Sequence, residues 1–207
     1  MANDYLKLML VTQRQSRELT EYLAFIEQCV LGGVSCVQLR EKNASQVFLS
    51  TFAHQLKALL DNYAVPLIIN DNVALAHEID AHGVHLGQSD GCPFQARERL
   101  GDSKIIGVSI ESYEGLQLSN EQPIDYVAAS AVFATTNKNN LRTIWGLDGL
   151  QVLATHAKHP LIAIGGINVS NTTAVLSAGA CGIAVIGSLH QAENPKDAAI
   201  ALRTLMR

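Results

Sequence analysis

Eight short runs rich in Val, Ile and Leu recur from one end of the chain to the other, separated by longer amphipathic stretches. Apolar runs of this length are typical of strands buried on both faces, and the stretches between them have helical spacing. The expected strands are residues 7–11, 36–39, 66–70, 83–87, 105–109, 126–130, 161–165 and 183–187. Eight such units predict an α/β fold, a compact single-domain (β/α)₈ TIM barrel over residues 1–207, with a doubly wound open sheet as the alternative.

The charge balance limits the classes of partner. The chain carries 15 Lys and Arg against 19 Asp and Glu, a formal net charge of -4, so no global basic field would attract nucleic acid or an acidic membrane. Apolar runs stay shorter than the roughly 18 residues of a membrane span, and the N-terminus does not resemble a secretory signal. We therefore expect a cytoplasmic protein with small-molecule substrates, no nucleic acid and no membrane.

A barrel carries its chemistry at the carboxyl ends of its strands, and polar residues gather at those positions here. By contrast, the starts of the expected strands carry almost none. We expect one rim to hold the site. The residues that follow or end the strands are Arg40, Glu41 and Lys42; Asn70 and Asp71; Gln88 and Asp90; Ser109; Thr135, Thr136 and Lys138; Gly165 and Gly166; and Gly187 and Ser188.

Two aspartates follow neighbouring expected strands. Asp71 and Asp90 could supply the paired oxygen ligands that Mg²⁺ prefers, since this ion keeps waters and takes further oxygens from phosphorylated substrates. Taken alone, each aspartate is better explained as the N-cap of the following helix. Nearby cations favour the metal interpretation, because Arg40, Lys42 and Lys138 would converge with Asn70 as donors for a diphosphate. The alternative for the charges of residues 40–42 is a solvated loop, where consecutive charged residues usually lie.

Two glycine-bearing corners end the last two expected strands, in the stretches AIGGIN and AVIGS. In barrels this pair of loops commonly seats a single phosphate, whereas the alternative is a tight turn that needs glycine for geometry alone. The chain's histidines show no paired-ligand spacing, so we expect no zinc site. His85 alternates with apolar neighbours and is expected to be packed or hydrogen-bonded inside the barrel, and Ser109 to form part of the cavity wall.

Motifs in a fixed order carry a family resemblance. They are QLREK (38–42), IND (69–71), GVHLGQSD (83–90), GVS (107–109), VFATTNK (132–138), WGLDGL (145–150), AIGGI (163–167) and IAVIGSL (183–189). Together they resemble thiamine-phosphate synthase. The resemblance implies an Mg²⁺-dependent transferase that joins a pyrimidine diphosphate to a thiazole phosphate. It also implies a homodimer.

The resemblance also implies roles for individual residues. Arg40, Lys42, Lys138 and Ser109 would be catalytic, and Asp71 and Asp90 would bind Mg²⁺. The remaining substrate-binding positions fall into two groups. Gln38, Leu39, Glu41 and Asn70 belong with Arg40 and Lys42 at the pyrimidine diphosphate, with Ser109 at the pyrimidine and Lys138 at the leaving group; Thr135, Thr136, Asn137, Gly166, Ile186 and Gly187 would surround the thiazole phosphate.

The chain departs from the family pattern in the thiazole-phosphate pocket. Ala134 and Asn137 stand where the family usually has proline and threonine, and Gly187 stands where it has serine. Two alternatives to the synthase are considered: a thiazole tautomerase-like isomerase, and a non-catalytic barrel that binds thiamine phosphates. The tautomerase branch typically carries a histidine where this chain has Ala131, which favours the synthase.

Overall fold

The computed structural model describes residues 4–88, 90–135 and 143–206. A short 3₁₀ helix, η1 (Asp4–Leu6), precedes the strands. The strands are β1 (Leu8–Val11), β2 (Cys36–Leu39), β3 (Leu67–Asn70), β4 (Gly83–Leu86), β5 (Ile105–Ile110), β6 (Tyr126–Ser130), β7 (Leu161–Ile164) and β8 (Gly182–Val185). The helices are α1 (Leu19–Leu31), α2 (Gln46–Asp61), α3 (Val73–Glu78), α4 (Pro93–Leu100), α5 (Tyr113–Ser119), α6 (Gly146–His156), α7 (Val169–Ser177), α8 (Gly187–His190) and α9 (Pro195–Thr204).

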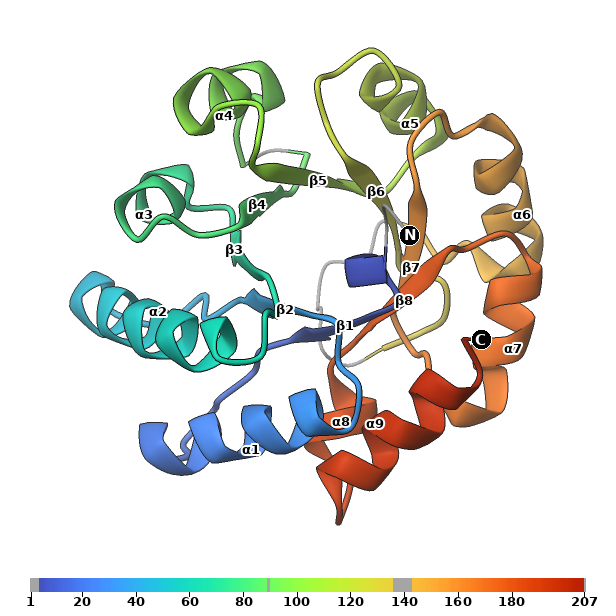
Figure 1. The fold of residues 1–207 in the computed structure, drawn as a ribbon. Helices are drawn as coiled ribbons and strands as arrows, with labels where there is room; N and C mark the ends of the chain where they lie inside the picture. Colours follow the sequence, from blue (N-terminus) through green and yellow to red (C-terminus); the bar gives the residue numbers. More distant parts are fainter. Residues whose placement is uncertain (1–3, 89, 136–142, 207) are drawn as a thin grey trace.

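The strands form one closed parallel barrel in chain order, and β1 pairs with β8 to complete it. The helices form a ring outside the strands (Figure 1). This confirms the predicted (β/α)₈ barrel, and the closed sheet contradicts the open-sheet alternative. One boundary differs by two residues: β8 ends at Val185 because Ile186 already precedes the short helix α8.

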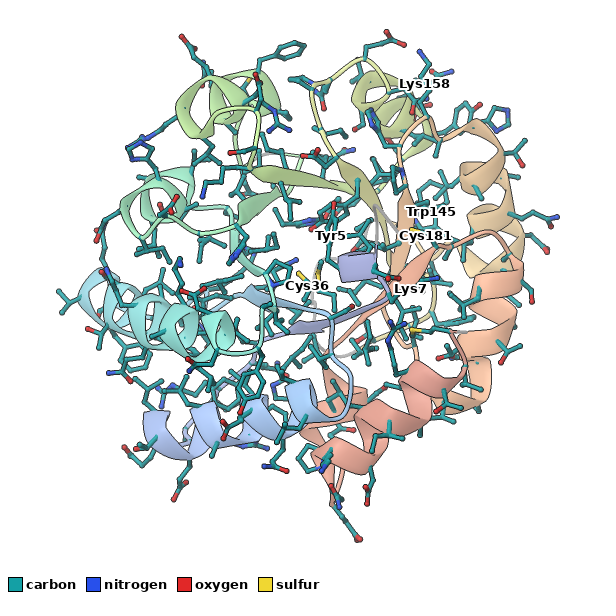
Figure 2. All side chains as sticks on the ribbon, in the orientation of Figure 1. Tyr5, Lys7, Cys36, Trp145, Lys158 and Cys181 are labelled. Carbon is teal, nitrogen blue, oxygen red and sulfur yellow. The ribbon has the colours of Figure 1, made fainter. Side chains whose placement is uncertain are left out.

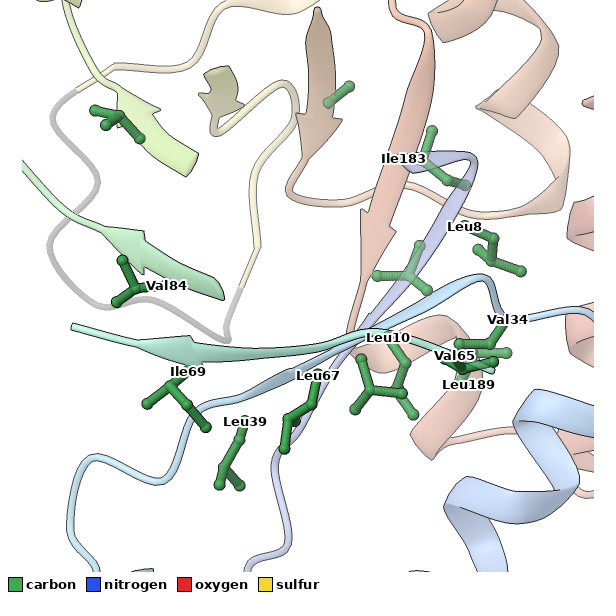
Figure 3. Close-up of a cluster of buried hydrophobic side chains, with 14 of the residues drawn as sticks. Leu8, Leu10, Val34, Leu39, Val65, Leu67, Ile69, Val84, Ile183 and Leu189 are labelled. Atoms are coloured by element: carbon green, nitrogen blue, oxygen red, sulfur yellow. The ribbon is translucent and has the colours of Figure 1, made fainter. Parts of the chain in front are cut away.

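Alternation along the strands divides the buried side chains into an inner and an outer core. Met9 and Val11 point into the barrel, whereas Leu8 and Leu10 pack against the helices. Figure 3 shows part of the outer core, including Leu39. Because successive strand residues face opposite sides, both cores are built from the same short runs, which explains why those runs read as continuously apolar.

The end of the barrel where the strands begin is closed by apolar packing. Tyr5 of η1 and Cys36 at the start of β2 lie near the centre of the ring in Figure 2. Tyr126 is fully buried beside them, and burial raises the pKa of its hydroxyl well above the usual value. Within the part of the chain that the structure describes, no helix is both long enough and apolar enough to cross a membrane.

Candidate active site

A cavity of about 1100 Å³ opens at the other end of the barrel, where the strands end. It is larger than most small-molecule pockets, so it has room for more than one small substrate. Alternate strand residues line it, because every second side chain points inward. The inward positions on the strands and just beyond them include Met9, Val11, Gln38, Arg40, Asn70, His85, Gly87, Ser109, Glu111, Ala128, Ser130, Ile162, Ile164, Ala184 and Ile186.

The same alternation separates the members of the predicted QLREK stretch. Gln38, Arg40 and Lys42 line the cavity. The side chain of Leu39 instead lies in the outer core, 1% exposed, and Glu41 turns back so that its Oε1 accepts a hydrogen bond from the Arg14 backbone N–H at 3.0 Å. The structure therefore does not bring the Leu39 and Glu41 side chains into the cavity that the other three residues share.

The two predicted metal-binding aspartates both line the cavity, and neither is a helix N-cap. The N-cap of α3 is Asn72, whose side chain accepts from Leu75 N–H at 2.9 Å, and that of α4 is Cys92. Asp71 adopts a left-handed backbone conformation with φ 61°, which is uncommon for a residue other than glycine, although aspartate adopts it more readily than most. The capping explanation considered for these residues is therefore wrong.

The two carboxylates converge on Gly87, directly after β4. Asp71 Oδ1 accepts a long hydrogen bond from Gly87 N–H at 3.4 Å, and Asp90 Oδ2 lies 2.0 Å from where a Cβ on residue 87 would stand. Asn70 Nδ2 donates to Asp71 Oδ2 at 2.5 Å and so fixes the other oxygen. Only glycine leaves Asp90 free to approach this closely.

Burial raises the pKa of Asp71, and the negative charge of Asp90 raises it further. The hydrogen bond from Gly87, the charge of Lys42 and the bond from Asn70 oppose this shift. Two neighbouring carboxylates that repel each other beside a glycine cradle suit a hard divalent cation. In the described ranges no group of three or more His, Cys, Asp or Glu side chains is placed to hold a metal ion.

Cationic side chains stand on the rim beside this carboxylate pair. Arg40 and Lys42 both line the cavity, and the backbone N–H of Arg40 donates to Thr12 Oγ1 at 2.9 Å, which fixes the end of β2 against β1. The predicted third cation, Lys138, lies outside the described residues, as do Thr136 and Asn137. Asn70, the neutral donor predicted for the same group, is brought to this part of the cavity.

The inner wall of the cavity holds a hydrogen-bonded chain across three strands. His85 Nδ1 lies 2.9 Å from Tyr126 Oη, and His85 Nε2 lies 2.9 Å from Ser109 Oγ. The predicted hydrogen-bonded role of His85 inside the barrel is confirmed. On the neighbouring wall, Gln38 Nε2 donates to the Met9 sulfur at 3.5 Å, which holds a buried amide in the cavity floor.

The corners after β7 and β8 meet at the opposite side of the cavity. Thr135, Gly166, Ile186 and Gly187 all line it, as predicted for a phosphate pocket, although the glycines also have a structural reason. A Cβ on Gly165 would lie 2.4 Å from Ala131 Cβ, and both Gly165 and Gly166 have positive φ. The Ser188 hydroxyl donates to the Ile167 carbonyl and joins the two corners.

Several lining residues were missed from the sequence. They are Met9, Val11, Glu111, Ala128, Ser130, Ile162, Ile164 and Gln191. Most lie at every second position of the runs that were recognised as strands. Extending the inward face of each strand from one known lining residue, for example from Gln38 or Ser109, would have found them and would also have excluded Leu39.

Comparisons with known proteins agree with this geometry. The family model described as thiamine monophosphate synthase matches residues 8–189. A thiamine-phosphate synthase of Chlamydia caviae is 46% identical over 206 residues, covering 100% of this chain and 97% of the relative, and one of Vibrio campbellii is 43% identical, covering 97% and 98%. The solved structure of a thiamine phosphate pyrophosphorylase from Pyrococcus furiosus superposes with a TM-score of 0.89 at 32% identity, covering 100% of this chain and 98% of that one.

Proposed function

Because the chain belongs to the thiamine monophosphate synthase family, we propose that its cavity joins 4-amino-2-methyl-5-(diphosphooxymethyl)pyrimidine to a (carboxy)thiazole phosphate. The products are thiamine phosphate and diphosphate, together with CO₂ when the thiazole carries a carboxyl group, so the protein is a transferase. The observation that carries the proposal is that one cavity holds two groups of residues suited to anions. The first is the carboxylate pair with its neighbouring cations, and the second is the pair of glycine-bearing corners after β7 and β8. The two sites match the two phosphorylated substrates.

The residues divide between the two substrates. Arg40, Lys42 and Asn70 receive the diphosphate, with Lys138 as a further cation, and Gln38 and Ser109 hold the pyrimidine ring. Asp71 and Asp90 would hold Mg²⁺, which when bound neutralises charge on the departing diphosphate. The proposed position of the thiazole phosphate is against Thr135, Gly166, Ile186 and Gly187. Thr136 and Asn137, which the family resemblance adds to this group, lie outside the described residues.

The reaction needs stabilisation of departing charge more than it needs a proton carrier. The bond from the pyrimidine methylene carbon to the diphosphate oxygen breaks, its electron pair leaves with diphosphate, and the thiazole ring nitrogen then supplies a lone pair to the same carbon. Arg40 and Lys42 stabilise the leaving charge, and the walls hold the nucleophile close. The lone pair of the thiazole nitrogen makes a general base unnecessary, so His85, which bonds Tyr126 and Ser109, is assigned a structural role in the cavity wall.

The alternatives are less well supported. A tautomerase moves a proton, but Ala131 lies at the cavity where that branch typically carries histidine, and alanine cannot exchange protons. A non-catalytic binding barrel would not need two carboxylates held together against their mutual repulsion beside Arg40 and Lys42. Both features favour the synthase.

Other expectations from the sequence remain predictions. They are a single catalytic domain over residues 1–207, a homodimer, a cytoplasmic location and the absence of nucleic-acid partners. Size-exclusion chromatography with light scattering would measure the oligomeric state.

The test of the proposed function is a turnover assay with both substrates and Mg²⁺, measuring thiamine phosphate and diphosphate together. We expect equimolar products from the natural protein and their loss in an Asp71→Ala/Asp90→Ala variant. An Asp61→Ala/Asp102→Ala variant removes the same charge from exposed positions at the opposite end of the barrel and should keep its activity. Failure of the natural protein to form thiamine phosphate would refute the proposal.

A further inference from the structure

Three segments meet beside the cavity: the loop after β1, the first turns of α1, and α8, which is far from the other two in the sequence. Tyr22 of α1 is fully buried between them, and its ring lies 5.8 Å from the ring of His190 at the end of α8. None of these side chains has a role in the reaction described above.

The polar atoms of this region form one directed chain. Gln13 N–H donates to Tyr22 Oη at 2.8 Å, Tyr22 Oη lies 2.7 Å from His190 Nε2, and His190 Nδ1 lies 2.7 Å from the Ile186 carbonyl oxygen. A carbonyl only accepts, so His190 Nδ1 carries the proton. In a neutral ring Nε2 is then the acceptor, and Tyr22 donates to it.

The surroundings favour the neutral ring that this direction requires. Burial lowers the pKa of His190; the bond to the Ile186 carbonyl opposes the shift, and the charge of Arg17 adds to it. The Arg17 guanidinium lies 4.9 Å from the centre of the Phe25 ring, and its Nη2 donates to the His190 carbonyl at 3.1 Å. This fixed cation beside the imidazole disfavours a second positive charge.

This series of hydrogen bonds ends at the Ile186–Gly187 peptide, which also lines the cavity. The Ile186 carbonyl and the Gly187 N–H are parts of one planar peptide, so fixing the direction of the carbonyl fixes the N–H on the opposite side. Ile186 and Gly187 both line the cavity, whereas His190 lies behind them. The Ile186 carbonyl also accepts from the backbone N–H groups of Leu189 at 3.2 Å and His190 at 3.1 Å, so the His190 ring adds a third and shorter bond to this carbonyl. His190 therefore helps to fix the direction of a donor that it does not itself present.

We propose that Tyr22 and His190 form a latch that positions the Ile186–Gly187 peptide for the phosphate of the thiazole substrate. The latch rests on the proposed function, which places that phosphate at this peptide. Tyr22 and His190 are positioning residues that act through the backbone. Tyr22 also accepts from Gln13, whose neighbours Thr12 and Arg14 bond Arg40 and Glu41, whereas the His190 ring bonds only Tyr22 and Ile186 among the contacts described above. A selective effect on the thiazole phosphate is therefore expected of His190→Ala.

A comparison within the chain shows what is special about His190. His54 also bonds through Nδ1 to the carbonyl four residues earlier, at 2.9 Å to Ser50, but it is exposed on α2. Tyr63 is a tyrosine whose hydroxyl bonds at the surface, donating to Glu27 at 2.6 Å. His54→Ala and Tyr63→Phe are therefore matched controls for His190→Ala and Tyr22→Phe.

The experiment measures kcat and KM for each substrate in the natural protein, the four single variants and a Tyr22→Phe/His190→Ala double variant. Losing a buried hydrogen bond should raise KM for the thiazole phosphate about tenfold in Tyr22→Phe and in His190→Ala. KM for the pyrimidine diphosphate should stay within about twofold in His190→Ala, which leaves the bond between Gln13 and Tyr22 in place. The double variant should match His190→Ala, since the two residues act through one chain, and both controls should behave as the natural protein.

The tautomer is measured separately, from ¹⁵N–¹H spectra of the histidine side chains, assigned with His190→Ala. We expect a neutral His190 ring with its proton on Nδ1 at neutral pH, independently of any turnover. A proton on Nε2, equal rises in both KM values in His190→Ala, or additive effects on the thiazole-phosphate KM in the double variant would overturn the latch while natural-protein turnover still upheld the proposed function. A natural protein without turnover would instead overturn the proposed function, and with it the latch's role at the thiazole phosphate.

Discussion

A Gly87→Ala substitution should damage the metal site while leaving the barrel folded. The added Cβ would stand 2.0 Å from Asp90 Oδ2, and ordinary contact begins near 3.4 Å, so this oxygen must retreat by about 1.4 Å. The nearest atom is the free end of a side chain, so the carboxylate can turn away without moving the backbone. Mg²⁺ holds its ligands at about 2.0–2.1 Å, and a retreat of this size removes Asp90 from its coordination.

The expected loss can be bounded. Changing residues that merely support a metal ligand typically costs about 10- to 100-fold in metal affinity, so displacing a ligand should cost at least as much. The assay is the Mg²⁺ concentration that gives half-maximal turnover in Gly87→Ala, with urea unfolding as the control for stability. We expect a rise of at least about tenfold and a change in unfolding free energy below about 1 kcal/mol.

The double variant with Asp90→Ala provides the internal control. Without the Asp90 carboxylate, the methyl group at residue 87 meets no charged ligand, so Gly87→Ala should add little to the effect of Asp90→Ala. An unchanged Mg²⁺ requirement in Gly87→Ala, or additive losses in the double variant, would refute the reasoning that the two aspartates share one ion beside this glycine.

Three further results are expected. Arg40→Ala should slow bond formation in single-turnover experiments about 100-fold, because a contact that strengthens as charge departs can contribute about 3 kcal/mol; weaker binding with an unchanged rate would contradict this. Asn72→Ala should lower the unfolding free energy by about 1 kcal/mol in urea titrations by removing the N-cap of α3. His82 accepts from Leu67 N–H through Nδ1. Burial lowers the pKa of His82, and the charge of Lys57 lowers it further. Below about pH 6.5 the unfolded chain therefore binds more protons than the folded protein, so the free energy of unfolding falls as the pH falls. His82→Asn should flatten that loss between about pH 7.5 and pH 5 in urea titrations, and an unchanged slope would contradict the assignment.

The barrel was predictable because one physical pattern repeats. Few folds other than a parallel sheet covered by helices can bury both faces of short apolar strands joined by amphipathic helices. The strand boundaries in the structure differ from the predicted ones by at most two residues. The end of β8 is the clearest difference, since nothing in the run IAVIG distinguishes a last strand residue from the residue before a short helix.

The site was only partly predictable from the sequence. Polar residues after strands located the rim, and strand alternation explains why Leu39 and Glu41 leave it. The relation between Asp90 and Gly87 depends on the path of the chain after β4, which no local spacing specifies. The contact between Tyr22 and His190 joins residues 168 positions apart, and only closure of the barrel brings them together.

The most direct test of the central claim is a crystal structure with Mg²⁺ and the pyrimidine diphosphate bound. The account predicts the ion between Asp71 and Asp90 and the diphosphate against Arg40 and Lys42, with the Gly166 and Gly187 corner left free for the second substrate. A diphosphate bound away from the carboxylate pair, or an ion that contacts neither aspartate, would contradict it.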